Sequence, residues 1–321
     1  MQRPAKNNRV LLLDPNHPLL EERLAGAGFR CDFFPSLTLA QLEEIIPDYA
    51  GIIFRSRFRL DAALLGRARN LCFIGRVGAG MEGIDVSFAA DQGIRCFNAP
   101  EGNRDAVGEH ALGMLLALMN RMLPADLEVR KGIWRREENR GTGLGGKCVG
   151  IVGYGNTGGA FARRLSGFGC TVLAYDKYRK RYTDAYAAEA GMDEIRVKAD
   201  VLSLHVPLTP ETLHLVNSAY LGSFAKKIWL VNTSRGPVVD TPALAAALKS
   251  GKVRGAALDV LEYESLSFES LNENDIPEAF SELAASDRVI LTPHVAGWTH
   301  ESKIKLAEVI AEKILAEFRI P

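Results

Sequence analysis

Short runs of apolar residues alternate with longer segments of helical periodicity along almost the whole chain. In the first hundred residues the apolar runs predict strands at 10–13, 31–34, 51–54, 71–74 and 95–97. The segments between them, such as PLLEERLAGAG and LTLAQLEEII, have the apolar spacing of helices. Strands that alternate with helices form parallel sheets covered by helices, so an α/β domain is expected.

A second alternating series follows the loop-like stretch at 135–147. Its strands are predicted at 148–152, 171–175, 201–205, 228–231, 255–258 and 289–291, which fits one doubly wound sheet of six strands. A long helical segment at about 103–121 precedes it and is apolar on more than one face, as in a helix that joins domains or forms a subunit contact. A last helix is expected at 301–318, returning to the first domain.

Length, charge and cysteine content narrow the class of protein. At 321 residues the chain exceeds the usual single-core size of roughly 100 to 200 residues, so two domains are expected. Basic and acidic residues balance at 39 each, so neither nucleic acid nor a membrane surface is expected as a partner. The five cysteines are scattered and none has metal-ligand spacing, which predicts reduced thiols, no metal site and a cytoplasmic location.

A glycine-rich turn opens the second series. Gly153, Gly155 and Gly158 have G-x-G-x-x-G spacing, directly after an apolar strand and at the start of a helical pattern. The three glycines would serve the tight turn, the close approach of backbone to a pyrophosphate, and the packing of helix on strand. The helix would begin at Asn156 and Thr157, where unpaired N–H groups favour phosphate. This context predicts a dinucleotide site.

Asp176 follows the next strand, TVLAY, where a carboxylate would bind the adenosine ribose hydroxyls. A carboxylate there repels a 2′-phosphate, which favours NAD over NADP. A basic run follows and would favour NADP, unless it is simply a solvated loop: Lys177, Arg179, Lys180 and Arg181. NAD is the expected cofactor.

Ionisable side chains follow three later strands of the same predicted sheet. Arg235, a carboxylate in DVLEYE, and His294 all lie at carboxyl ends, where open parallel sheets bind ligands. Histidine suits the proton transfer that accompanies hydride transfer from a carbinol, a carboxylate would orient its ring, and arginine would bind a substrate carboxylate. The carboxylate is assigned to Glu264, although the pattern alone barely separates it from Glu262. A 2-hydroxy acid or 2-keto acid is the implied reactant.

The remaining histidines are given other roles. His205 is expected to line the cofactor cleft or fill space, and His17, His110, His214 and His300 to be structural or exposed.

The chain resembles the D-isomer-specific 2-hydroxyacid dehydrogenases. The resemblance is carried in the family's order by GRVGAGMEGID, NAPEGNRDAVGEHALGMLLAL, GIVGYGNTGG, LSLHVPLTPET, VNTSRGPVVD, GAALDVLEYE and TPHVAGWT. It implies a two-domain α/β fold, in which a doubly wound Rossmann NAD-binding domain (101–295) is inserted in a smaller flavodoxin-like substrate domain (1–100 plus 296–321). It also implies a homodimer, with the apolar 103–121 helix resembling the dimerisation element.

The resemblance also assigns residues. It implies the catalytic trio Arg235, Glu264 and His294, which selects Glu264 over Glu262. The implied cofactor-binding residues are Gly153, Gly155, Asn156, Thr157, Gly158, Asp176, His205, Val206, Pro207, Thr233, Ser234, Asp259 and Gly297. Those implied for substrate are Arg55, Val77, Gly78, Ala79 and Gly80.

The choice of substrate stays open at this level. Arg55, Arg57 and Arg76 would suit a phosphate, which favours 3-phosphoglycerate; solvated arginines would favour a glyoxylate or hydroxypyruvate reductase instead. An NAD-sensing scaffold, similar to transcriptional corepressors that share this fold, is a non-enzymatic alternative. The chain departs from the family pattern at Ser265, where proline is common, and in the long stretch that follows it.

Overall fold

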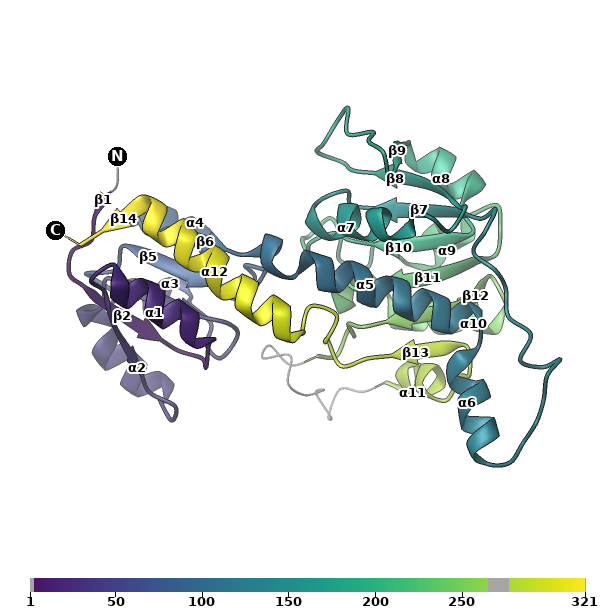
Figure 1. Ribbon diagram of the computed structural model, residues 1–321, viewed down its shortest axis with the longest axis horizontal. Coiled ribbons are helices and arrows are strands. Elements are labelled where there is room, and N and C mark those ends of the chain that lie inside the picture. The colour runs from purple at the N-terminus through teal and green to yellow at the C-terminus, as the bar shows by residue number, and fades with distance from the viewer. Residues whose placement is uncertain (1–2, 265–276, 321) are drawn as a thin grey trace. The chain divides into compact units, whose positions relative to one another are not determined.

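The structure is a computed structural model that describes residues 3–264 and 277–320. These residues form two compact units, each with a parallel sheet of its own (Figure 1). The first unit contains residues 3–103 and 298–320, and the second contains 104–264 and 277–297. The divisions thus follow residues 103 and 297, compared with 100 and 295 in the sequence prediction.

The first unit has a five-stranded parallel sheet in the order β3-β2-β4-β5-β6. Its strands are β2 (Arg9–Leu12), β3 (Arg30–Phe33), β4 (Gly51–Phe54), β5 (Phe73–Arg76) and β6 (Arg95–Asn98). Helices α1 (Pro18–Gly26) and α12 (His300–Glu317) pack on one face, and α2 (Leu39–Ile45), α3 (Ala62–Leu65) and α4 (Val86–Asp91) on the other. The strand order is that of flavodoxin, as expected.

Two details of this unit differ from the sequence prediction. The strand expected at 71–74 is β5, two residues later, because the Leu71 N–H donates to the Ala68 carbonyl and Leu71 enters the core from a turn. The ends of the chain also pair as β1 (Arg3–Pro4) and β14 (Phe318–Arg319), strands too short to produce a periodic pattern.

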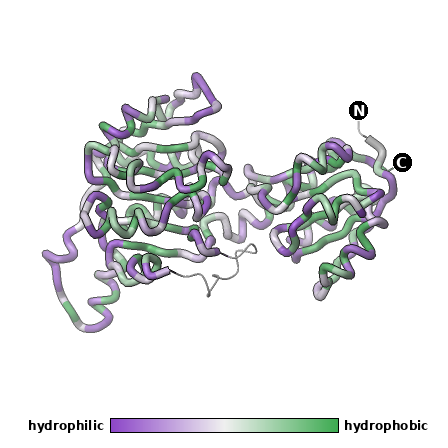
Figure 2. Tube along the Cα trace, turned by 180° about the vertical axis from the view of Figure 1, so that it is seen from behind, coloured by the Kyte–Doolittle hydropathy of each residue, from purple (hydrophilic) through white to green (hydrophobic). Residues whose placement is uncertain are grey.

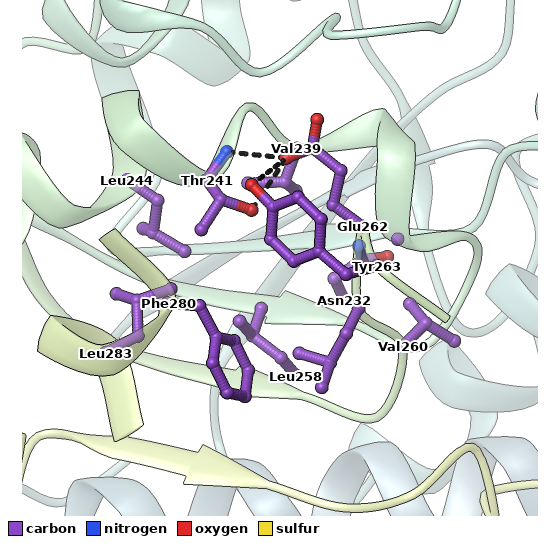
Figure 3. A pocket seen from close by; sticks show the side chains of 12 residues that line it. Asn232, Val239, Thr241, Leu244, Leu258, Val260, Glu262, Tyr263, Phe280 and Leu283 are labelled. Carbon is purple, nitrogen blue, oxygen red and sulfur yellow. Dashed lines mark hydrogen bonds between the residues drawn. The ribbon is translucent and has the colours of Figure 1, made fainter. Parts of the chain in front are cut away.

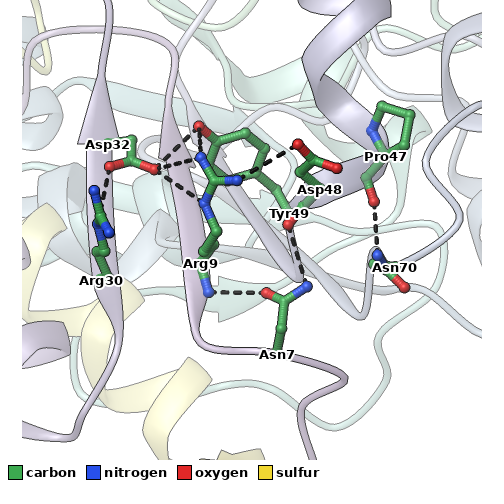
Figure 4. Close-up of polar contacts among 8 residues, drawn as sticks. All are labelled: Asn7, Arg9, Arg30, Asp32, Pro47, Asp48, Tyr49 and Asn70. Carbon is green, nitrogen blue, oxygen red and sulfur yellow. Dashed lines mark hydrogen bonds and ion pairs between the residues drawn. The ribbon is translucent and has the colours of Figure 1, made fainter.

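A polar cluster joins Arg9 at the amino end of β2, Asp32 in β3 and Tyr49, which precedes β4 (Figure 4). The Arg9 guanidinium donates to Asp32 at 3.0 Å and to the Tyr49 hydroxyl at 2.9 Å, and that hydroxyl donates to Asp32 at 3.1 Å. Burial and the Asp32 carboxylate raise the pKa of Tyr49 to about 12. Because ligands of parallel sheets bind at the carboxyl ends, this cluster is a structural feature.

The second unit has a seven-stranded parallel sheet in the order β13-β12-β11-β10-β7-β8-β9. Its strands are β7 (Cys148–Val152), β8 (Thr171–Tyr175), β9 (Ala188–Glu189), β10 (Val201–Leu204), β11 (Ile228–Asn232), β12 (Val253–Leu258) and β13 (Val289–Leu291). This is the Rossmann order extended by one strand. Six strands were predicted; the seventh, β9, has only two residues and leaves no readable pattern.

Helices cover both faces of the second sheet. Helix α5 (Pro100–Met119), from Arg104 on, and α7 (Asn156–Leu165) pack on one face. The other face carries α8 (Met192–Lys198), α9 (Ser218–Gly222), α10 (Thr241–Lys249) and α11 (Glu278–Ala284). Apolar residues, drawn in green in Figure 2, lie along the strands inside each unit. None of the helices that the structure describes is long and apolar enough to cross a membrane.

Candidate active site

The order of the second sheet reverses between β7 and β10, and the glycine turn follows β7. Gly153 has a φ of 94°, and a Cβ there would lie 2.4 Å from the His205 carbonyl oxygen. A Cβ on Gly158 would lie 2.0 Å from the carbonyl oxygen of Gly153, whereas one on Gly155 would meet nothing within 4 Å. The first and last glycines are therefore required for packing, and the middle one faces open space where a ligand could approach.

The residues around this turn suit a dinucleotide. Helix α7 begins at Asn156, and no side chain caps its first turn, so the backbone N–H groups there can bind an anion. His205 Nδ1 and Thr233 Oγ1 lie buried at the ends of β10 and β11 and have no hydrogen-bond partner in the described part of the chain. Buried polar atoms are normally paired, so these two atoms fit the donors and acceptors of a bound cofactor.

Asp176 follows β8, the strand beside β7. One carboxylate oxygen accepts the Tyr154 N–H at 2.9 Å, and the other accepts the N–H groups of Tyr178 at 3.0 Å and Arg179 at 2.9 Å. Burial opposes the charged form, but these N–H groups outweigh it and lower the pKa of Asp176. The site thus carries a fixed negative charge, which is unfavourable for a 2′-phosphate.

Glu264 and His294 form the centre of the candidate active site. The His294 Nδ1 atom lies 2.7 Å from a Glu264 carboxylate oxygen, and the two side chains are 24% and 14% exposed. The second Glu264 oxygen accepts the Leu261 N–H, which fixes the carboxylate within the loop after β12. Since Nδ1 is bonded to Glu264, Nε2 is the ring atom that would exchange a proton with a substrate.

Asp259 organises the turn that carries His294. Its carboxylate accepts the Thr292 hydroxyl at 2.6 Å and the N–H groups of Val295 and Ala296, both at 2.9 Å. Its carbonyl oxygen accepts the His294 N–H at 2.7 Å. Asp259 is only 1% exposed, so its contact with a cofactor stays a prediction, while its role as anchor of the turn is visible.

Arg235 lies after β11, the neighbour of β12. The Asn232 side chain shapes its turn, donating to the Arg235 carbonyl at 3.0 Å and accepting the Ser234 hydroxyl at 2.7 Å. The Asn232 carbonyl in turn accepts the Asp259 N–H at 3.0 Å. The loop of Arg235 is therefore tied to the loop of Asp259 and Glu264.

Glu262, the rival carboxylate, takes part in a different cluster (Figure 3). One oxygen lies 2.5 Å from His214 Nε2, and the other accepts the Thr241 N–H at 3.0 Å and the Thr241 hydroxyl at 2.7 Å. Burial opposes ionisation, but the Thr241 and His214 contacts outweigh it and lower the pKa of Glu262. Glu262 therefore binds the first residue of α10. Glu264 is the carboxylate that contacts His294.

The residues expected to bind substrate lie in the first unit, after β4 and β5. Arg55 packs its guanidinium 3.9 Å from the centre of the Trp298 ring. Arg76 donates to the Val77 carbonyl at 2.9 Å, and its guanidinium lies against Gly78, where a Cβ would come within 1.7 Å of Nη1. The Ala79 carbonyl accepts the Asn98 amide at 2.6 Å. These roles stay predictions.

Arg57 is a different case. Its guanidinium donates to the carbonyls of Leu13, Phe34 and Leu37, which makes it a structural link between loops. Among the other residues predicted for the site, Val206 and Pro207 follow β10 and Gly297 follows β13, as expected. Ser265 and the stretch to 276 lie outside the described residues. His110, expected to be structural or exposed, lies 3.1 Å from the Thr292 hydroxyl.

Comparisons with known proteins identify the family of this chain. A sequence model described as "D-isomer specific 2-hydroxyacid dehydrogenase, NAD binding domain" matches residues 112–296. A D-3-phosphoglycerate dehydrogenase of Archaeoglobus fulgidus is 33% identical over 96% of this chain and 56% of its own length. A glyoxylate reductase of Thermofilum pendens is 38% identical over 80% of this chain and 75% of its own length.

Among solved structures, the D-lactate dehydrogenase of Aquifex aeolicus, in complex with NAD and lactic acid, superposes with a TM-score of 0.82. It is 28% identical, with coverage of 96% of this chain and 95% of that one. The chain spans about half the length of several curated phosphoglycerate dehydrogenases that it matches. The comparisons confirm the expected family resemblance, the Rossmann-type fold and NAD as the cofactor.

Proposed function

We propose that this chain, which belongs to the D-isomer specific 2-hydroxyacid dehydrogenase family, is an oxidoreductase that interconverts a D-2-hydroxy acid and a 2-keto acid with NAD. The observation that carries the proposal is the 2.7 Å pair of His294 and Glu264. The pair lies at the carboxyl edge of the same sheet that presents the glycine turn and Asp176.

In this proposal each residue of the trio has one task. NAD, when bound, would supply the hydride chemistry at C2 of the substrate. His294 donates a proton from Nε2 to the C2 oxygen during reduction and removes it during oxidation. Glu264 holds the imidazole through Nδ1 and stabilises its protonated form. Arg235 binds the substrate carboxylate and the adjacent oxygen, which orients C2.

The rest of the site would bind the cofactor and the far end of the substrate. Gly155 and the first turn of α7 would hold the pyrophosphate, and Asp176 the adenosine ribose. The backbone of Val77 to Gly80 would bind the substrate carboxylate. Arg55, which follows β4, and Arg76, the last residue of the neighbouring β5, favour a phosphorylated substrate such as 3-phosphoglycerate. A glyoxylate or hydroxypyruvate reductase is the alternative, supported by the Thermofilum pendens relative.

Purified protein should be mixed with NADH or NADPH and with phosphohydroxypyruvate, hydroxypyruvate, glyoxylate or pyruvate while cofactor absorbance is followed. We expect oxidation of NADH and the highest kcat/KM with phosphohydroxypyruvate. Arg55→Ala should raise KM for phosphohydroxypyruvate about tenfold or more and leave KM for glyoxylate unchanged. Arg59→Ala, at an exposed position, is the control and should change neither KM. No oxidation with any of the four acids would contradict the proposal.

The proposed assembly is a homodimer. Helix α6 (Met122–Arg130) exposes Met122, Leu123 and Leu127 at 52%, 45% and 56%, and Trp134 is 77% exposed. A groove of about 310 Å³, lined by α5, α6 and residues near β13, runs beside them. Exposed apolar surface of this kind favours a subunit contact. Leu127→Glu should convert the dimer to a monomer in sedimentation experiments, and Val197→Glu, at an exposed position of α8, should not.

A cytoplasmic location is also proposed. It is supported by the five cysteines, which are all free thiols in the structure. Fractionation of cells that express the full-length protein tests it, and recovery from the membrane or the exterior would contradict it.

A further inference from the structure

His110 contacts the turn that carries His294, although it belongs to helix α5. Its Nε2 atom lies 3.1 Å from the Thr292 hydroxyl oxygen and 3.5 Å from Oδ1 of Asp259. Thr292 has a single hydroxyl proton, which it donates to Oδ1 of Asp259 in a hydrogen bond of 2.6 Å. The Thr292 oxygen must then accept from His110, so Nε2 carries hydrogen.

The Asp259 carboxylate to which this chain of bonds leads is the anchor of residues 292–296. Besides Thr292, it binds the N–H groups of Val295 and Ala296, and it is 1% exposed. Within the described residues, His110 is the ionisable side chain that contacts it. A buried carboxylate is stable only when its oxygens are hydrogen-bonded, so the donors around Asp259 determine how firmly the turn is held.

The turn needs such support because His294 has a strained backbone. Its φ is 53°, in the left-handed region that is unfavourable for residues other than glycine. The Asp259 carbonyl accepts the His294 N–H at 2.7 Å and opposes relaxation of this conformation. A looser Asp259 would allow the imidazole to turn away from Glu264.

We propose that His110 is a positioning residue for His294 and acts through Thr292 and Asp259. As a role in catalysis, the inference rests on the proposed dehydrogenase function. The neighbours of His110 along the inner face of α5, such as Met114, Leu115 and Leu118, are buried and apolar. The imidazole adds a donor directed at Thr292.

The kinetic test compares His110→Phe, which keeps an aromatic ring without the donor, with Thr292→Val, which removes only the hydroxyl. Each should lower kcat about tenfold, leave the NADH dissociation constant within twofold, and raise the primary deuterium isotope effect. The double variant should be no worse than either single variant, because both break one chain of bonds. His110→Gln, which retains a side-chain N–H donor, should recover most of kcat.

Glu109→Gln is the matched control. Glu109 precedes His110 on α5 but forms an ion pair with Arg164 at 3.0 Å. The Glu109→Gln variant should therefore have the kcat of the wild-type protein. Additive losses in the double variant would overturn the proposal. So would a loss of thermal stability without a change in kcat, or an equal loss in His110→Gln.

An arm that does not need turnover uses NMR of the full-length free protein. The His294 ring resonances, assigned by their absence in His294→Ala, should move in His110→Phe and Thr292→Val and return in His110→Gln. If the wild-type protein turns over no 2-keto acid but these resonances move, the proposed function fails and the positioning contact stands. If the protein is active and the resonances do not move, the positioning inference alone fails.

Discussion

The Nδ1 atom of His294 lies 2.7 Å from a carboxylate oxygen of Glu264, 30 positions earlier in the chain. The two residues lie in different loops, one after β12 and one after β13, and these strands are neighbours in the sheet. Adjacent parallel strands therefore convert a long separation in sequence into a direct contact. The neighbouring Glu262 faces His214 and Thr241 instead, which provides an internal comparison between two glutamates.

Glu264→Gln should lower kcat/KM by about 10²–10⁴, because the amide cannot stabilise a protonated imidazole. NADH binding, measured by fluorescence titration, should stay within about twofold of wild type. Glu262→Gln is the control: it should lose about 1–3 kcal/mol of stability in urea unfolding and keep kcat. Equal kinetic losses in the two variants would refute this assignment of the two carboxylates.

His294→Ala should abolish turnover and leave NADH binding largely intact, because its ring contacts Glu264 rather than the glycine turn. Steady-state kinetics and a fluorescence titration of NADH on the same preparation measure the two effects. A simultaneous loss of turnover and cofactor binding would mean that the ring is needed for the fold.

Three alanine substitutions in the glycine turn should have three different effects. Gly158→Ala should destabilise the protein, because its Cβ would lie 2.0 Å from the Gly153 carbonyl oxygen. Gly155→Ala should fold normally and bind NADH at least tenfold more weakly, since its Cβ enters open space where the pyrophosphate is proposed to bind. Gly159→Ala, in helix α7, should be neutral or up to about 1 kcal/mol stabilising. Thermal unfolding and NADH titration separate these outcomes; normal NADH affinity in Gly155→Ala would contradict the placement of the cofactor.

Asp176→Ala should narrow the preference for NADH over NADPH about tenfold or more, because a fixed negative charge is removed. The ratio of kcat/KM for the two cofactors measures this effect. Asp184→Ala is the control, since that carboxylate binds the Tyr154 hydroxyl at 2.9 Å instead. An unchanged ratio in Asp176→Ala would show that cofactor choice is determined elsewhere.

His205 should make the protein sensitive to acid. Burial lowers the pKa of His205 from 6.5 to about 3, so the folded state keeps the ring neutral while the unfolded state takes up a proton. The free energy of unfolding therefore does not depend on His205 above about pH 6.5. Below that pH it falls by up to about 1.4 kcal/mol per pH unit as the pH decreases toward 3. Urea unfolding across this range should show a shallower pH dependence in His205→Asn, and exposed His300→Asn should match wild type. The same slope in all three proteins would contradict it.

The sequence by itself determined the class of fold and the strand ends on which the chemistry depends. Alternation of apolar runs and helical segments revealed eleven of the strands. Several of these, such as β4, β7 and β10, are buried on both faces and therefore need continuous apolar residues. The glycine turn and Asp176 could also be predicted from the sequence. A backbone that approaches a phosphate and a carboxylate that binds a ribose require particular residues at a fixed spacing. Strands of two residues, such as β9, left no pattern.

Tertiary structure decided which side chains meet. In the sequence, only the family resemblance distinguished Glu264 from Glu262, because the two glutamates follow the same strand and are two residues apart. The direction of each carboxylate is set by the partners that the fold brings to it, His294 in one case and Thr241 with His214 in the other. His110 was missed for the same reason, since its contact with Thr292 spans 182 positions and depends on how α5 packs on the sheet. Local pattern encodes burial and backbone conformation, whereas pairing of distant polar groups exists only once the sheet and its helices have assembled.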